Sequence, residues 1–149
     1  PNTDISELYL ESEPAYLEMV IGTFGEPNRN GTTFTMPKDE LVKRLDAMVG
    51  KVVGEIGQNR LKGEDISRIS KVDPTLSAGV LLSYEIKDTD HGFQVNGKIR
   101  PNPIVLDEMS ISPKQGSFGI RALTSSETPD GKRDILQLIS FDYLPPLER

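Results

Sequence analysis

The second half of the sequence alternates between apolar and polar residues in segments that turn signals separate, and this pattern constrains the fold most strongly. Residues 78–88 (AGVLLSYEIKD) and 93–101 (FQVNGKIRP) lie on either side of a short polar turn. Residues 117–126 and 133–144 flank a second turn at residues 128–131 (TPDG). Two alternating runs around a short turn are typical of a β-hairpin. The pattern therefore predicts two hairpins.

Three further segments are strand-like. Residues 16–24 (YLEMVIGTF) and 67–72 (SRISKV) alternate well enough for a strand, and Asp-Pro ends the second of them. The step from Asn30 to Gly31 favours a tight turn with positive φ, after which residues 32–35 (TTFT) predict another strand.

One helix is predicted, over residues 37–49. Pro37 suits a first turn, Asp39 and Glu40 complement the positive end of the helix dipole, and Gly50 supplies the stop. Its apolar stripe consists of Leu41, Val42, Leu45, Met48 and Val49. Many closely spaced strands with one clear α-helix predict a mainly β chain of the α+β class, as a compact antiparallel β-barrel or sandwich with a packed helix.

Length and charge set the domain organisation and exclude several function classes. We expect an acidic N-terminal arm over residues 1–13 and a single domain over 14–149, large enough for a real core. No apolar run is near the length of a membrane span, and no secretory signal is seen, so we expect a soluble protein without a membrane partner. The net charge of −6 disfavours nucleic acid as the partner.

The chain has no cysteine and one histidine, His91. Disulfides, thiolate catalysis and histidine-rich or cysteine-rich metal sites are therefore excluded. Asp88 and Asp90 lack the remaining ligands of a calcium loop, and there is no phosphate-cradling glycine loop. We expect neither a metal nor another cofactor.

The candidates for catalysis are few. His91 lies in the polar turn between residues 88 and 92, where an exposed turn residue is the stronger interpretation than a general base. A serine can act as a nucleophile only with a base within hydrogen-bond reach. This condition applies equally to Ser117, Ser125 and Ser126. Glu55, between two glycines, is interpreted as the end of a strand, solvated or bonded to neighbouring amides.

Five segments, in order, carry a resemblance to one family. They are residues 26–35 (EPNRNGTTFT) before the helix, 54–58 (GEIGQ), 95–99 (VNGKI), 118–122 (FGIRA) and 134–146 (DILQLISFDYLPP). Together they resemble the head-maturation (prohead) serine proteases of tailed phages, over nearly the whole chain. The resemblance implies that family's compact β fold. It also implies a place in the virion head or the prohead, assembled in the host cytoplasm.

Two departures from the family's pattern concern the chemistry. Gln58 stands where the resemblance places the catalytic histidine, and Gly119 stands where it places the serine. Glutamine cannot take a proton at neutral pH, and glycine has no nucleophile. The resemblance therefore implies an inactive member. We expect a capsid decoration or assembly protein that docks on the major capsid protein or the scaffold protein, as a homo-oligomer or symmetrically on the capsid lattice. One alternative is an active protease that uses Ser117 as nucleophile, His91 as base and Glu55 as an assisting carboxylate. Another is a small β-domain interaction module unrelated to phage heads, in which the motif matches arise by chance.

Overall fold

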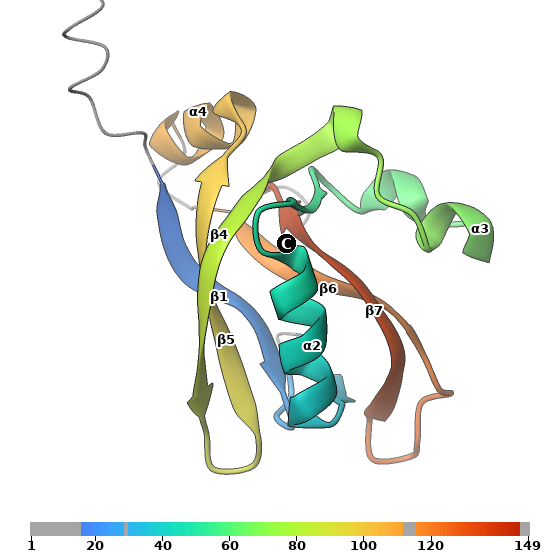
Figure 1. Cartoon of the computed structure of the whole chain (residues 1–149). Helices are drawn as coiled ribbons and strands as arrows, with labels where there is room; N and C mark the ends of the chain where they lie inside the picture. Colours follow the sequence, from blue (N-terminus) through green and yellow to red (C-terminus); the bar gives the residue numbers. More distant parts are fainter. Residues whose placement is uncertain (1–15, 29, 112–115, 147–149) are drawn as a thin grey trace, which may run out of the picture.

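The computed structural model describes residues 16–146 apart from residue 29 and residues 112–115. Its strands form two sheets (Figure 1). In spatial order, the first sheet consists of β1 (Leu17–Phe24), β5 (Phe93–Pro101), β4 (Ser77–Asp88) and β3 (Val52–Glu55). The second consists of β2 (Thr33–Thr35), β7 (Lys132–Leu144) and β6 (Ser117–Thr124). The helices are α2 (Lys38–Met48), α3 (Ile66–Ile69) and α4 (Pro103–Ile111), with 3-10 turns η1 (Asn59–Leu61) and η2 (Pro74–Leu76).

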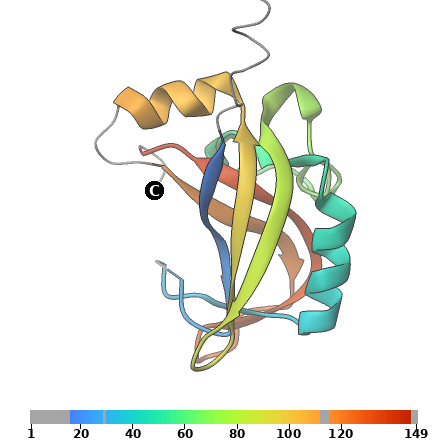
Figure 2. The same ribbon diagram turned by 60° about the vertical axis from the view of Figure 1, so that its left-hand side comes forward.

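The predicted mainly β chain of the α+β class, with a clear helix against the sheets, is confirmed. The sheets do not close into a barrel. All pairings in the first sheet are antiparallel, whereas β2 pairs in parallel with β7, so the second sheet is mixed. Closure fails on one side because β1 and β6 are both edge strands that form no ladder with each other. Figure 2 shows β1 in blue at the edge of the first sheet, beside β5.

The locally encoded elements lie where the sequence predicts them. β4 and β5 form the first hairpin, and β6 and β7 form the second. β1 and β2 occupy the predicted strand segments near the N-terminal end of the described chain. Gly31 has a φ of 83°, which is the positive value that the Asn-Gly step favours before β2. Residues 1–13, the predicted arm, lie outside the described residues.

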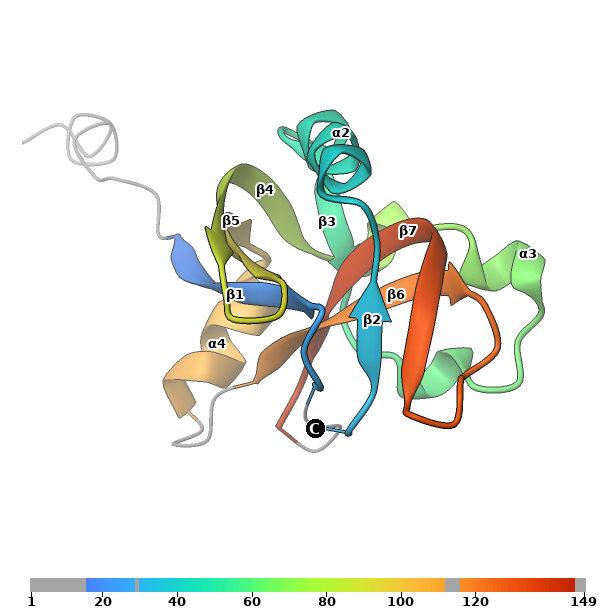
Figure 3. The ribbon, with the colours of Figure 1, turned by 90° about the horizontal axis from the view of Figure 1, so that it is seen from below.

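The helix α2 covers one side of the space between the two sheets (Figure 3). Its side chains Leu41, Leu45 and Met48 are buried in the core. The guanidinium of Arg44 donates to the carbonyl oxygens of Leu138 and Ile139 at 2.9 and 2.7 Å, which ties the helix to β7. Of the predicted apolar stripe, Val49 is exposed, and Gly50 ends the helix with a φ of 83°.

Two elements differ from the sequence-based expectation. The strand predicted over residues 67–72 is wrong, because Ile66–Ile69 forms the short helix α3. The Asp65 side chain accepts a hydrogen bond from the Arg68 amide and so caps that helix. The helix α4 was not predicted, although the Asn102 side chain accepts from the Ile104 amide at 2.9 Å in the same manner.

The two sheets make backbone contact where β3 crosses β7. A Cβ atom on Gly54 would lie 2.1 Å from the carbonyl oxygen of Phe141, so only glycine fits at this crossing. Three residues further along, the Gly57 amide donates to the Tyr143 carbonyl at 2.7 Å. Apolar side chains from β1, α2, β3, β4, β5, β6 and β7 meet in one core around this crossing.

Candidate functional site

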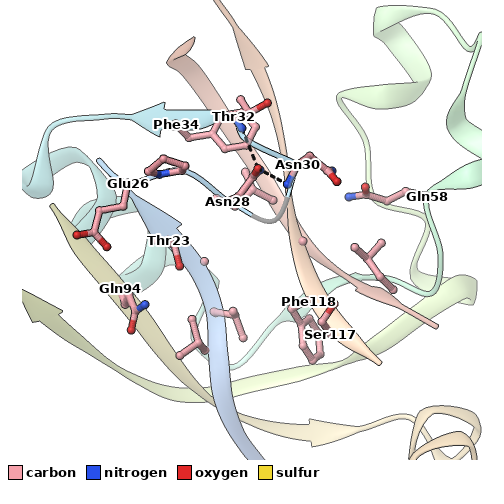
Figure 4. A pocket seen from close by; sticks show the side chains of 17 residues that line it. Thr23, Glu26, Asn28, Asn30, Thr32, Phe34, Gln58, Gln94, Ser117 and Phe118 are labelled. Atoms are coloured by element: carbon pink, nitrogen blue, oxygen red, sulfur yellow. Dashed lines mark hydrogen bonds between the residues drawn. The ribbon is translucent and has the colours of Figure 1, made fainter. Parts of the chain in front are cut away.

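A groove of about 660 Å³ opens between β1 and β6, the two sheet edges that do not pair (Figure 4). The loop before β2 and the side chain of Gln58 complete its wall. The polar side chains that line it are Thr23, Glu26, Asn28, Asn30, Thr32, Gln58, Gln94 and Ser117. Among the described residues that line the groove, Glu26 is the one with an ionisable side chain. The described part of the groove lining is therefore mostly neutral and polar, with one carboxylate.

Gln58 and Gly119 meet in this groove although they are far apart in the sequence. A Cβ atom on Gly119 would lie 3.9 Å from the Nε2 atom of Gln58. That Cβ would also lie 2.8 Å from Cδ1 of Leu144, the far end of a half-buried side chain. The two positions that the family resemblance singles out are thus direct neighbours across the groove.

Asp142 stands behind Gln58 and connects the groove to the protein interior. Its side chain is fully buried, and its Oδ2 atom accepts a hydrogen bond from Gln58 Nε2 at 2.9 Å. Its Oδ1 atom accepts from the Glu55 amide at 2.8 Å and from the Ser140 hydroxyl at 2.9 Å. Both oxygens of the Asp142 carboxylate therefore accept hydrogen bonds inside the protein.

Glu55 is the centre of a buried charge network. Its side chain is fully buried, and its oxygens accept from Arg60 at 2.6 Å, from Arg68 at 2.7 Å and from Arg121 at 3.0 Å. The Asp73 amide donates to the same carboxylate at 3.0 Å. The expectation of a solvated carboxylate is therefore wrong for Glu55, and that of a carboxylate bonded to amides holds for the Asp73 amide but did not include the three arginines. A single side chain ties β3 to β6 and to the segment of residues 59–76.

Arg121 joins the two buried carboxylates. Its side chain is 5% exposed, and its Nη2 atom lies 3.0 Å from an oxygen of Glu55 and 3.0 Å from an oxygen of Asp142. Its Nε atom donates to the Ser140 hydroxyl at 3.1 Å, and Nη1 donates to the Lys71 carbonyl at 3.1 Å. A planar guanidinium with five donors suits this position, which a lysine ammonium could not fill.

The network sets how Glu55 titrates. Burial alone would raise the pKa of Glu55, but hydrogen bonds from Arg68, the Asp73 amide, Arg60 and Arg121 outweigh it and hold the pKa well below the usual range. The carboxylate is therefore ionised throughout the neutral range, and its proton is not available for general acid chemistry.

This lowered pKa makes part of the stability depend on pH. Because the folded pKa lies below the unfolded value of about 4.3, Glu55 contributes stability that is fully present above that value. The contribution is lost as the pH falls through the folded pKa. We expect the free energy of unfolding to fall more steeply below pH 4.3 in the wild type than in Glu55→Gln. Urea unfolding at pH 7, 5, 4 and 3 measures the difference, and parallel curves for the two proteins would contradict it.

The structure separates the three residues of the predicted alternative site. Ser117 lines the groove. His91 is exposed in the turn between β4 and β5 and is not among the groove-lining residues. Glu55 lies in the interior and is bonded to three arginines. Gln58 and Gly119, by contrast, share the groove with Ser117.

Sequence reasoning missed the polar residues behind the groove. Asp142 offered one signal, since it interrupts the otherwise apolar end of β7, and a charged residue in such a run is buried with a partner or at a bend. No signal in the sequence indicated the roles of Arg60, Arg68 and Arg121, because a single sequence does not show which carboxylate a distant arginine will pair with.

The described part of the chain contains neither a membrane-spanning helix nor a cluster of metal-ligating side chains. No helix among these residues combines the length and apolarity required to cross a bilayer. No group of three or more histidine, aspartate or glutamate side chains gathers there as a potential metal site.

Comparison of the chain with protein-family models, with curated proteins and with solved structures finds no match.

Proposed function

We propose that this chain is a non-enzymatic structural or assembly protein of a phage head, with the frame of a prohead protease but without its catalytic groups. The observation that carries the proposal is the meeting of Gln58 and Gly119 in the groove, with 3.9 Å between Gln58 Nε2 and a Cβ placed on residue 119. These are the two positions at which the resemblance places the family's base and nucleophile. Their proximity is what an emptied active site requires.

Asp142 supports the same proposal. In a serine protease triad, a buried carboxylate accepts a hydrogen bond from the histidine that acts as base. Here Asp142 accepts from the amide of Gln58 at 2.9 Å instead. Asp142 thus has the position of the carboxylate that orients the base in a triad, but its partner is Gln58. Glutamine can make the hydrogen bond, but it cannot transfer a proton.

The proposed role is a capsid decoration protein or an inactive head-assembly component. Its partner is the major capsid protein or the scaffold protein, which it meets as a homo-oligomer or by symmetric docking on the capsid lattice. Its place is the virion head or the prohead, assembled in the host cytoplasm. The net charge of −6 suits docking between proteins rather than on a nucleic acid.

Mass spectrometry of purified proheads and mature heads tests this proposal. We expect peptides of this chain in at least one of the two particles, in proportion to the major capsid protein across a density gradient. Particles of both kinds that lack the chain would contradict a head component. The chain must sediment with the particle peak of the gradient, because this excludes a contaminant that is not part of the particle.

A second candidate function is an active head-maturation protease, which is favoured by one observation, the presence of Ser117 in the groove. The other two groups that it needs lie elsewhere. His91 is exposed in a hairpin turn, and Glu55 is bonded to arginines in the interior. A serine without a base within reach retains little of the rate of a triad. We therefore prefer the non-enzymatic function.

A further inference from the structure

Residues 59–76, all of which the structure describes, contribute little to the apolar core. The segment contains η1, α3 and η2, and neither α3 nor η2 has a buried residue. Leu61 is buried, but no side chain of the segment belongs to the described core cluster. Ile66 and Leu76 are 67% and 36% exposed. Figures 1 and 3 show α3 at the outer edge of the fold.

Charged and polar groups attach this segment to the sheets instead. The carboxylate of Glu55 on β3 accepts from Arg60 at 2.6 Å. The same carboxylate accepts from two nitrogens of Arg68 at 2.7 and 3.0 Å, and from the Asp73 amide at 3.0 Å. These donors come from the beginning, the middle and the end of the segment. The attachment therefore converges on one carboxylate.

The segment has hydrogen bonds of its own that maintain its shape. The Asp65 side chain caps α3, and the Asp73 side chain caps η2. The two ends of the segment meet at its base, where the Ile56 amide donates to the Leu76 carbonyl at 2.9 Å. A surface loop with capped turns and joined ends can move away as one unit without disturbing the sheets.

Glu55 keeps a cationic partner when the segment moves away. Arg121 lies 3.0 Å from Glu55 and belongs to β6, not to the segment. A buried carboxylate without any partner would be costly, but this one stays paired. Opening loses the bonds to Arg60 and Arg68, whose side chains are already 37% and 30% exposed, and the bond from Arg121 to the Lys71 carbonyl. Opening the segment therefore costs less than unfolding the sheets.

We propose that residues 59–76 form a strap that opens as one unit while both sheets stay folded, and that the Glu55 carboxylate is the latch that holds it closed. The strap begins directly after Gln58, whose side chain lines the groove and bonds to Asp142. Opening therefore loosens one wall of the groove and exposes Glu55. The inference goes beyond the proposed function and holds whether or not the chain is a head component.

Native-state hydrogen exchange tests the proposal on the wild type. Exchange is followed by NMR at pH 7 over a series of urea concentrations below the unfolding transition. The strap reporters are the amides of Ile69, Ser70 and Asp73, and the reference amides are those that pair β4 with β5. We expect the three reporters to share one protection factor, at least tenfold below that of the reference amides. It should depend little on urea, because opening exposes little surface.

Two substitutions in the strap test the latch. Arg68→Met removes two hydrogen bonds to Glu55 that exist only while the strap is closed. It should lower the protection of the reporters and of the reference amides by the same factor, at least threefold, because both openings start from the closed state. Lys62→Met removes the same charge from an exposed position of η1's C-cap, outside the contacts of Glu55 described above. It should change neither protection factor by more than twofold.

A substitution in the core separates opening of the strap from global unfolding. Leu81→Ala removes a fully buried side chain of β4 and should lower the protection of the reference amides at least tenfold. The strap reporters should stay within twofold of the wild type, because the strap opens while β4 remains folded. If Leu81→Ala does not fold, Ile99→Val on β5 makes the same comparison with a smaller loss.

Several results would overturn the proposal. Reporters as well protected as the reference amides in the wild type, with the same urea dependence, would show that the strap opens only on global unfolding. Equal losses of protection in both sets of amides in the core variant would show the same. Three reporters with different protection factors would contradict a single unit, and an effect of Arg68→Met no larger than that of Lys62→Met would contradict the latch.

Discussion

Arg121→Met should destabilise the protein by about 3–5 kcal/mol, which is the cost of breaking a buried ion pair by removing one partner. The substitution leaves Glu55 and Asp142 buried without the guanidinium that lies 3.0 Å from each of them. Glu55 keeps Arg60 and Arg68, but Asp142 loses its positive partner. Urea unfolding at pH 7, monitored by circular dichroism, measures the change in the free energy of unfolding.

Arg133→Met is the matched control, because it removes the same charge from an exposed position. The Arg133 side chain is 38% exposed and pairs with Glu127 at 3.5 Å on the surface. Surface pairs of this kind contribute about 0–1 kcal/mol, so the control should change stability by no more than that. Similar losses in Arg121→Met and Arg133→Met would show that the buried network does not have the role described here.

A double variant separates charge from packing. If most of the loss in Arg121→Met comes from the carboxylates left behind, then removing the charge of Glu55 as well should recover part of it. Glu55→Gln combined with Arg121→Met should therefore be less destabilised than the sum of the single variants. Strict additivity would indicate that Arg121 contributes by filling space rather than by its charge.

Gly54→Ala should destabilise the protein strongly, by about 3 kcal/mol or more. The added Cβ would lie 2.1 Å from the carbonyl oxygen and 2.6 Å from the carbonyl carbon of Phe141. Because the obstacle is backbone, β3 must move away from β7. That movement would also strain the bond from the Glu55 amide to Asp142. Urea unfolding under the same conditions measures the loss.

Gly119→Ala is the control for Gly54→Ala, since it adds the same methyl group to another strand. The nearest atom to its Cβ, at 2.8 Å, is the end of the Leu144 side chain, which can rotate away. We expect a change within about 1 kcal/mol, typical of a site with a movable neighbour. Equal losses in the two alanine variants would contradict the close backbone crossing of β3 and β7.

The elements that the sequence predicts well are those determined by neighbouring residues. Both hairpins carry their alternation and their turn signals within one short continuous segment, residues 77–101 for β4 with β5 and residues 117–144 for β6 with β7. The helix α2 carries its stripe and its terminal glycine in the same way. Local chemistry determines these elements, so one sequence suffices for them.

The errors arise where two local patterns compete or where the partner is distant. Residues 67–72 alternate like a strand, but the Asp65 cap and the short distance to Pro74 favour a single helical turn. The parallel pairing of β2 with β7 joins residue 33 to residue 132, and no local signal specifies such a pairing. The same holds for the ion pairs of Glu55 with Arg68 and Arg121.

The candidate site was predictable in part. The two positions singled out by the resemblance, Gln58 and Gly119, are neighbours in the groove. The carboxylate behind them was not predicted, because only the hydrogen bond with Gln58 shows that Asp142 belongs to the candidate site. Nor did the sequence indicate that the groove would lie between two unpaired strand edges, which depends on how the sheets fail to close.

We propose that the groove holds no catalytic unit, and co-expression of this chain with the capsid and scaffold precursors of the phage head to which the proposed function assigns it tests that claim most directly. The cleavage state of both precursors is read by intact-mass spectrometry, with Ser117→Ala as the site variant and Ser126→Ala, on an exposed loop, as the matched control. We predict that both precursors stay intact with the wild type and with either variant. Specific cleavage that Ser117→Ala abolishes and Ser126→Ala preserves would contradict the claim.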